Sequence, residues 1–381
     1  MRFIRHPSDN TPRGHTRDAI KRMILTRGYR VGQKLPTYRD LAAHFGIAVR
    51  TVERVMRQLA EEGIVQLLHG KGAFVKKLPP GRGQLAEVGL VYPASRMLLV
   101  QTDYLNQILT GVIVQCELAH TDLQIVAFRE AGRPEPVPVP PRDIALKVDG
   151  VLLLGVLNDR YIAEFAREAI PLVLVDAQTQ AAPIPCICVD NTQAVDQVVD
   201  HLYQLGHRRI AYVDARSQDP LVHAGRVEWV DSGDTRERRE AYLAAMARLG
   251  LAGQQRIYRL ADDNPTALVE PVISSLRRER SAPTAILVYD APWGAQLCEG
   301  LSAAGLRVPQ EISIAGAVGA GFHRAGAHSL TCGVVDFRAM GEQAMQILQA
   351  QATGGSAAEP MVHRLASTLA VGTTTAAPQT S

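Results

Sequence analysis

The chain has 381 residues, of which 46% are hydrophobic and 21% are charged, and its formal net charge is +3 at pH 7. This composition is typical of a soluble globular protein, and the length predicts two or three folding units. No apolar run reaches the roughly 18 residues that a transmembrane helix needs, and no signal-peptide pattern opens the chain. We therefore expect no membrane association and a cytoplasmic location.

The charge is unevenly distributed along the chain. Residues 1–84 contain 17 Lys and Arg against 6 Asp and Glu, a net charge of +11, whereas the remaining residues contain 24 against 32, a net charge of −8. A small basic segment on a larger acidic body indicates that the basic segment meets a polyanion. A solvated charged surface is the alternative, but such surfaces rarely divide so sharply between two parts of a chain.

Three predicted helices follow one another in the basic segment. An apolar stripe over residues 20–24 indicates a first helix, which Gly28 ends. Thr37 is the predicted N-cap of a short second helix. Gly46 is the predicted tight turn into a third helix, which we expect from about Ala48 to Glu62.

The third predicted helix has two different faces. Spacings of four and three place Arg50, Arg54 and Arg57 on one face. Apolar residues repeat with the same period on another face, namely Val49, Val52, Met56 and Leu59. One side of this helix is therefore suited to a core, and the other to a negatively charged partner.

A short hairpin is predicted after this helix, with two strands around the turn His69-Gly70-Lys71-Gly72. Three helices followed by a basic-tipped hairpin form a winged helix-turn-helix, whose third helix can enter the major groove of DNA. We expect the arginine face to contact phosphates and bases. In the wing, we expect His69 and Lys71 to contact the adjacent groove, because the glycines allow a close approach to the DNA backbone.

The sequence KLPTYRDLAAHFGIAVRTVERVMRQLAEEGIV, with GKGAFV after it, resembles the GntR family of bacterial winged-helix transcription regulators over about residues 12–77. This resemblance implies that the family's base and phosphate contacts fall on Arg39, Arg50, Thr51 and Gly70. The chain departs from the family pattern at Ala48, Val49 and Glu53, where the family has a small hydroxyl residue and two arginines. We therefore expect an operator sequence that differs from the family's usual one.

After a breaker-rich linker at residues 78–85, the pattern changes to apolar strands that alternate with helices. The predicted strands are AEVGLVY, LQIVAF, DGVLLLG, PLVLVD, RRIAYV, AILVYD and EISIAG. Near-continuous apolar strands that alternate with helices indicate an α/β fold with parallel sheets covered on both faces. Residues 86–372 are too many for one such sheet, so two α/β lobes are expected.

The body contains no recognisable catalytic or metal motif. It lacks a Walker loop, a G-x-S-x-G elbow and a His pair with metal spacing, so we predict no enzyme activity and no cofactor. Its five cysteines are scattered, and only Cys186 and Cys188 are close together, so reduced thiols are expected. The glycine-containing run 316–321 lacks the Rossmann order and is interpreted as a hinge or ligand-lining loop.

A second resemblance covers about residues 86–372. The segments DGVLLLG, IPLVLVD, VDNTQAVDQVVDHLYQLGHRRIAYV, RREAYLAAMARLGL, GLRVPQEISIAG and SLTCGVVDFRAMGEQAMQIL occur in the order found in the LacI-family sensor domain. This resemblance implies a fold related to periplasmic sugar-binding proteins, in which three crossovers join two lobes and an effector, most often a sugar, binds between them. Ligands of parallel sheets bind beyond the carboxyl ends of the strands, which agrees with such a site.

Four residues are candidates for effector binding. By resemblance, Arg238 fills the family's Arg-x-x-Gly/Ala-aromatic position, where the guanidinium holds ligand hydroxyls or a carboxylate. A solvated helix face, shared with the neighbouring arginines, is the alternative. Asp290 follows a strand where the family keeps a ligand-binding acid, and Trp293 either stacks on a sugar ring or packs in the core. Asp190 lies at the first crossover, as a hinge residue or a ligand contact.

These observations predict a ligand-responsive transcription repressor with a GntR head and a LacI body, of the arabinose-repressor type. The expected parts are a DNA-binding domain (1–77), a linker (78–85), a sensor domain (86–372) and a flexible tail (373–381). The expected partners are palindromic double-stranded operator DNA, a small-molecule effector that is a sugar, and a second copy of the chain. We expect the dimer interface to use the apolar helix face with Met340, Ala344, Ile347 and Leu348.

Two other functions compete with this prediction. Some GntR-headed proteins carry a pyridoxal-phosphate body of the aminotransferase type, which needs a Schiff-base lysine. Lys147 is the only lysine after residue 77, and it comes just before a strand, which disfavours that function. The remaining alternative is an architectural DNA-binding protein whose body no longer binds a ligand, because the acidic pair that the family has after ISIAG is replaced by Ala317 and Val318.

Overall fold

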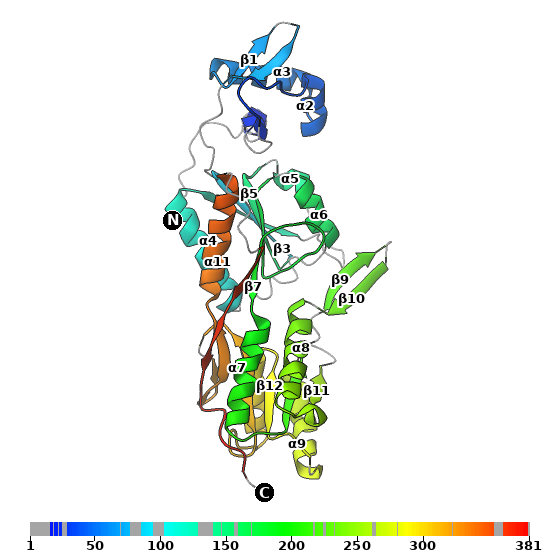
Figure 1. The fold of residues 1–381 in the computed structure, drawn as a ribbon, viewed down its shortest axis with the longest axis vertical. Helices are drawn as coiled ribbons and strands as arrows, with labels where there is room; N and C mark the ends of the chain where they lie inside the picture. The colour runs from blue at the N-terminus through cyan, green and yellow to red at the C-terminus, as the bar shows by residue number, and fades with distance from the viewer. Residues whose placement is uncertain are drawn as a thin grey trace.

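In the computed structural model, a small head lies at one end of an elongated body made of two lobes (Figure 1). The structure describes residues 16–379 apart from 18, 22, 25–28, 69, 77–84, 94–102, 129–139, 146, 156–158, 169, 216–217, 224–225, 232, 261–263, 280, 322 and 354–360. The predicted helix end at Gly28 and nearly all of the predicted linker therefore lie outside the described residues.

The head has the predicted order of helices and strands: α2 (Tyr38–Phe45), α3 (Val49–Glu61), β1 (Val65–Leu68) and β2 (Gly72–Val75). Thr37 is the N-cap of α2, as predicted, and forms a capping box with Asp40. Gly46 ends α2 in the left-handed conformation, with φ 65°, which lets the chain turn into α3.

The head has a hydrophobic core of its own. Ile20, Met23 and Ile24, from the helical residues before α2, are buried in it together with Val52, Val55, Met56 and Leu59 of α3. Val49 does not belong to this core, because 39% of it is exposed at the first turn of α3. The predicted apolar face of α3 is therefore correct from Val52 onward and wrong for Val49.

Two six-stranded sheets form the body, one in each lobe (Figure 1). The sheet of lobe 1 is entirely parallel, in the order β17-β7-β6-β5-β3-β4. Lobe 1 contains β3 (Glu87–Pro93), α4 (Asp103–Ala119), β4 (Asp122–Phe128), α5 (Pro141–Ala145), β5 (Gly150–Leu154), α6 (Asp159–Arg167), β6 (Leu172–Val175), β7 (Cys186–Val189), α11 (Phe337–Ala352) and β17 (Val362–Leu365). Every strand predicted for this part of the chain is present.

The sheet of lobe 2 has the order β11-β8-β12-β13-β16-β18, and only its edge strand β18 runs antiparallel to its neighbour. Lobe 2 contains α7 (Asn191–Gln204), β8 (Ile210–Asp214), α8 (Gly233–Arg248), β11 (Arg256–Arg259), α9 (Val269–Arg278), β12 (Ala285–Val288), α10 (Ala291–Ala303), β13 (Ser313–Gly319), β16 (Thr331–Val335) and β18 (Ser367–Ala370). Strands β11, β16 and β18 were not predicted, because their sequences are short or polar.

The chain crosses between the lobes three times: from β7 to α7, from β16 to α11 and from β17 to β18. The first and third crossovers are hydrogen-bonded to each other. The N–H of Asp190 donates to the carbonyl of Leu365 at 2.8 Å, and the N–H of Ser367 donates to Gln193 Oε1 at 2.7 Å. These bonds fix the hinge between the lobes.

Helix α11 packs inside lobe 1 and does not offer its apolar face to a partner. Met340, Ala344 and Leu348 are 0% exposed and Ile347 is 8% exposed, so the predicted dimer face is wrong. Its neighbour is α4, and the two backbones come very close: a Cβ on Gly341 would lie 2.1 Å from the carbonyl oxygen of Ile108. The apolar period of α11 therefore reflects a close helix pair within one subunit.

Two stretches of the body form strand structure beyond the predicted strands. The run 316–321 was interpreted as a hinge or ligand-lining loop, but Gly316 to Gly319 end strand β13, and only Ala320 and Gly321 lie in the loop that follows. A Cβ on Gly316 would lie 2.7 Å from the Cα of Ala291, so glycine is needed there for α10 to pack on the sheet. The stretch between β8 and α8 forms a two-stranded hairpin, β9 (Gln218–His223) and β10 (Arg226–Asp231), which projects from lobe 2 (Figure 1).

The segment after β18 is bound to lobe 2 and is not a flexible tail over residues 373–376. Thr374 is 0% exposed, and its hydroxyl accepts a hydrogen bond from the N–H of Thr331 at 3.0 Å. His207 Nε2 lies 2.9 Å from the carbonyl oxygen of Ala376, and His207 Nδ1 lies 2.9 Å from the hydroxyl of Thr284. Because a carbonyl only accepts, Nε2 carries the proton of a neutral imidazole.

His207 should make folding pH-dependent. Burial lowers the pKa of His207 to about 4, below the ordinary value of 6.5. The unfolded chain therefore binds a proton that the folded chain does not, and stability falls as pH drops from about 6.5 toward 4. We expect this one group to lower the free energy of unfolding by about 2 kcal/mol between pH 7 and pH 5. Urea unfolding of the full chain at both pH values should show that difference, and His207→Gln should remove most of it.

The matched control for this prediction is His120→Asn. His120 is exposed and has φ 53°, a conformation that Asn tolerates, so this substitution should leave the pH dependence unchanged. An equal pH dependence in wild type and His207→Gln would contradict the assignment to His207.

Candidate DNA-binding head and inter-lobe effector site

The candidate DNA surface lies on α2, α3 and the wing. The predicted contacts Arg39, Arg50, Arg54, Arg57, Gly70 and Lys71 are all exposed, and Thr51 is half-buried at the start of α3. Predicted contact His69 lies outside the described residues. The geometry thus leaves the arginine face of α3 free for a groove, while its opposite face is in the core.

The wing is wider than the two predicted strands. Lys34 pairs with Phe74 in an isolated bridge, and the N–H of Leu35 donates to the carbonyl of Ala73 at 2.9 Å. Residues before α2 therefore add a third, short strand-like segment to the hairpin. This segment was not predicted, because two residues, exposed Lys34 and buried Leu35, are too few to form a recognisable strand pattern in the sequence.

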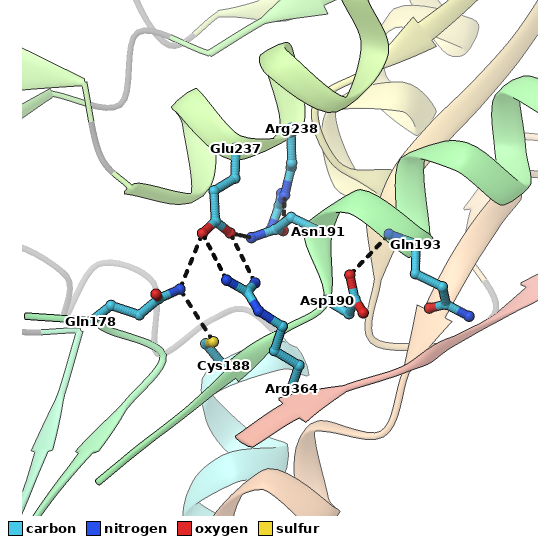
Figure 2. A network of polar contacts seen from close by, with 8 residues as sticks. All are labelled: Gln178, Cys188, Asp190, Asn191, Gln193, Glu237, Arg238 and Arg364. Atoms are coloured by element: carbon cyan, nitrogen blue, oxygen red, sulfur yellow. Dashed lines mark hydrogen bonds and ion pairs between the residues drawn. The ribbon is translucent and has the colours of Figure 1, made fainter. Parts of the chain in front are cut away.

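Residues from both lobes meet around the first crossover (Figure 2). We call Gln178, Asn191, Glu237, Arg238 and Arg364 the inter-lobe network. Gln178 and Arg364 belong to lobe 1, Glu237 and Arg238 lie on α8 of lobe 2, and Asn191 begins α7 directly after the crossover. A ligand between the two lobes would lie next to these side chains.

Arg238 is buried at the centre of this region, with 6% exposure. Its Nε donates to Asn191 Oδ1 at 2.8 Å, and its Nη1 donates to the carbonyl of Tyr289 at 3.1 Å. Its Nη2 lies 3.8 Å from Asp234 Oδ2, and the guanidinium lies over the Tyr289 ring at 4.4 Å. The alternative of a solvated helix face is therefore wrong for Arg238, although neighbouring Arg236 is exposed.

Asp290 and Trp293 lie next to Arg238 at the start of α10. The carboxylate of Asp290 caps this helix by accepting the N–H of Trp293 at 2.8 Å. Burial raises the pKa of Asp290 to about 6, against the opposing effects of that hydrogen bond and of Arg238. Trp293 is half-buried, and its ring centre lies 5.7 Å from that of Tyr289. The structure thus brings three of the four predicted effector residues together in lobe 2.

The fourth predicted residue, Asp190, lies at the hinge. Its carboxylate accepts the N–H of Gln193 at 3.0 Å and so caps α7 (Figure 2). In this position the side chain is committed to the helix start, which supports a hinge role over direct ligand contact.

Several residues near the site were not singled out from the sequence. Tyr104 of α4 donates its hydroxyl to Asp176, which directly follows β6 in a left-handed conformation with φ 51°. Sparsely populated backbone conformations of this kind cluster at active sites and ligand clamps. The aspartate after PLVLV was a visible signal, whereas Glu237 and Arg364 are ordinary surface residues in the sequence.

No group of three or more His, Cys, Asp or Glu side chains among the described residues is placed to hold a metal ion. All five cysteines are buried and free. Among the helices that the structure describes, none has both the length and the apolar character needed to cross a membrane.

The fold and these two sites define a class of protein: a winged-helix DNA-binding head joined to a two-lobed sensor domain. Comparison with known families agrees with both parts. Residues 12–75 match the bacterial regulatory proteins of the gntR family, and residues 199–375 match the periplasmic binding protein-like domain. These matches agree with the predicted GntR-type head and with the predicted periplasmic-binding-protein-like body.

Curated relatives include the arabinose metabolism transcriptional repressor of Geobacillus stearothermophilus, 24% identical over 300 residues, which are 77% of this chain and 78% of that protein. Catabolite control protein A of Priestia megaterium is 26% identical over 171 residues, 45% of this chain, and the match spans only 48% of that protein. The Geobacillus relative is named a transcriptional repressor, which agrees with the predicted class of transcription regulator.

The fold is shared with a solved LacI transcriptional regulator from a Rhodococcus species, with a TM-score of 0.59 and 21% sequence identity. The match covers 76% of this chain and 98% of that one. At this identity the likeness concerns the fold alone, and it confirms the predicted arrangement of parallel sheets in two lobes.

Proposed function

We propose that the protein represses transcription by binding palindromic operator DNA as a dimer, and that an uncharged sugar bound between the lobes weakens this binding. The observation that carries the proposal is the exposed arginine face of α3 on a head of the GntR type. A regulator of this kind acts on the bacterial chromosome and so in the cytoplasm, as the sequence predicts.

Two heads are needed because one winged helix covers too little DNA for specific repression. Half-sites about one helical turn apart then match a two-fold dimer. With α11 buried, the exposed apolar residues of lobe 1 are the better candidates for contacts between subunits. They are Ile113 and Leu118 of α4, Ile125 of the edge strand β4 and Val362 of the edge strand β17, with exposures of 39%, 71%, 49% and 38%. Sedimentation of the full chain at micromolar concentration tests the dimer.

The charges around the effector site favour an uncharged ligand. Each guanidinium there already faces a carboxylate of the protein: Arg238 faces Asp234, and Arg364 faces Glu237. A phosphate or carboxylate on the effector would have to compete with these groups. Hydroxyl groups can instead share the remaining donors and acceptors, and aromatic Trp293 offers a face for a sugar ring. The Geobacillus relative is named for arabinose metabolism, which supports a sugar as the class of effector.

Lobe 1 acts on the head through a direct contact as well as through the linker. Arg142 of α5 in lobe 1 donates from Nη2 to the carbonyl oxygen of Ala43 in α2 at 3.2 Å. An effector changes DNA affinity only if it binds one arrangement of the lobes better than the other. Movement of lobe 1 would then shift one head relative to the other on the rigid duplex.

The test has two stages, both with the full chain. Selection from a library of random duplexes should enrich a palindrome with two half-sites, whereas enrichment of no sequence would argue for an architectural protein. A panel of pentoses, hexoses and their phosphates is then screened by thermal shift, because a ligand that binds the native state raises the unfolding temperature. Stabilisation by a neutral sugar and not by its phosphate is expected.

Replacing Arg238 should separate effector binding from DNA binding. We expect Arg238→Lys to weaken binding of the stabilising sugar at least about tenfold, because lysine keeps the charge but loses the planar set of donors. Operator affinity without sugar should stay the same, since α8 is far from the head (Figure 1). The control is Arg236→Lys on the same helix, where the side chain is exposed. A normal sugar response in Arg238→Lys would show that the site is elsewhere.

A further inference from the structure

Glu237 connects Arg238, the proposed effector contact, to lobe 1 (Figure 2). On one side, its carboxylate accepts hydrogen bonds from two groups of lobe 1: Gln178 Nε2 at 3.1 Å and Arg364 Nη2 at 3.3 Å. On the other side, it accepts Asn191 Nδ2 at 2.8 Å, and Asn191 Oδ1 accepts Arg238 Nε at 2.8 Å. A continuous chain of polar contacts therefore runs from Arg238 to lobe 1.

The Asn191 amide in this chain has a single favourable orientation. Asn191 is 3% exposed, and its oxygen faces a guanidinium while its nitrogen faces a carboxylate. A flipped amide would place its NH₂ group against the guanidinium and its oxygen against the carboxylate, and both contacts would be repulsive. The Glu237 carboxylate thus fixes Asn191, and Asn191 in turn fixes the direction of the Arg238 side chain.

The hydrogen bonds between Glu237 and lobe 1 depend on how the two lobes are arranged. Gln178 lies between β6 and β7, and Arg364 lies in β17 just before the third crossover. Rotation of the lobes about the crossovers would move both side chains away from α8. The same movement would break a second hydrogen bond across the lobes, from Gln107 Nε2 of α4 to the carbonyl of Ala320. Side chains of the protein therefore link the two lobes at two separate places.

We propose that Glu237 is a positioning residue with two linked roles: it aligns Arg238 for the effector through Asn191, and it holds lobe 1 against lobe 2 through Arg364 and Gln178. The effector part of this inference rests on the proposed function. The lobe contact does not, because it joins only groups of the protein itself. Effector binding next to Arg238 then acts on lobe 1 through these side chains as well as through the crossovers of the hinge.

The contact between lobes can be tested without DNA or effector. Hydrogen–deuterium exchange of the full chain should be faster in Glu237→Gln and in Arg364→Gln at the amides of Asp190 and Ser367, which join the first and third crossovers. We expect a two- to fivefold increase, the range for a partly exposed ion pair. The double variant should exchange no faster than either single variant, because the two residues act as one pair.

The matched control is Glu240→Gln, an exposed glutamate on the same helix, which should exchange like the wild type. If Glu237→Gln exchanges like Glu240→Gln, or if the effects of the two single variants multiply in the double variant, the contact between lobes is overturned.

The alignment of Arg238 is tested with the neutral sugar found by thermal shift. Glu237→Gln should weaken sugar binding two- to fivefold, because the alignment of Asn191 is impaired together with the lobe contact. Arg364→Gln should weaken it less, because Asn191 keeps its carboxylate partner. Equal weakening in both variants would reduce the role of Glu237 to the lobe contact. If no sugar binds, the proposed function fails, and the exchange experiment still decides whether the lobes are held together by this pair.

Discussion

Removing the three arginines of α3 should nearly abolish specific DNA binding. We expect the triple variant Arg50→Ala, Arg54→Ala, Arg57→Ala to bind the selected operator at least about a hundredfold more weakly, since each base or phosphate contact contributes roughly 1–3 kcal/mol. The slope of log affinity against log salt should also become shallower by up to about 0.9 for each phosphate that the variant no longer neutralises. Fluorescence anisotropy with labelled operator at several salt concentrations measures both quantities.

The fold of the head should survive this change, because all three side chains are exposed and the core face of α3 is untouched. The control is Arg160→Ala, Arg277→Ala, Arg307→Ala, which removes the same charge from exposed positions in the body. This control separates local contacts from the effect of net charge. Equal weakening in the two triple variants would mean that α3 has no special role, and an unchanged salt slope would exclude phosphate contacts by these arginines.

Replacing Gly341 by alanine should destabilise lobe 1 strongly. In an isolated helix, alanine is more favourable than glycine by about 1 kcal/mol. Here the new Cβ would lie 2.1 Å from the carbonyl oxygen of Ile108 and 2.9 Å from the N–H nitrogen of Val112. These are backbone atoms of α4 that cannot rotate away, so the helices must separate. We expect a net loss of about 3 kcal/mol in the free energy of unfolding, measured by urea denaturation.

A matched substitution exists on another helix. Gly233 begins α8, and a Cβ there would meet nothing within 4 Å, so Gly233→Ala should be neutral or slightly stabilising. If Gly341→Ala were as stable as Gly233→Ala, the close approach of α4 and α11 would not exist in solution.

Much of the fold could be predicted because its signals are local. The capping residue Thr37, the left-handed Gly46 and the period of Val52, Met56 and Leu59 all act within a few residues, and each lies where it was expected. The strands that were predicted are all present, since a strand covered on both faces must be apolar along its whole length, although the interior strand β16 was missed. Arg238 was found by resemblance to the LacI family and not by its surroundings in the sequence.

The missed features depend on pairs of residues far apart in the chain. Glu237 and Arg364 are separated by 127 positions, and neither is unusual where it stands. The apolar face of α11 was real, but periodicity does not reveal whether the partner is another subunit or, as here, α4. His207 depends on the carbonyl of Ala376, in a segment whose polar composition suggested a free end.

The interleaving of the two lobes also affects how the protein is made on the ribosome. The core of the head is complete once Val75 has been synthesised. Lobe 1 lacks α11 and β17, and lobe 2 lacks β18, until nearly 300 residues later. Because domains fold in the order in which they are synthesised, the head is ready first and both lobes finish almost together. A chain truncated before α11, for example by a nonsense mutation, would keep a head that can bind DNA. It would lack complete lobes, and its DNA binding would no longer respond to an effector.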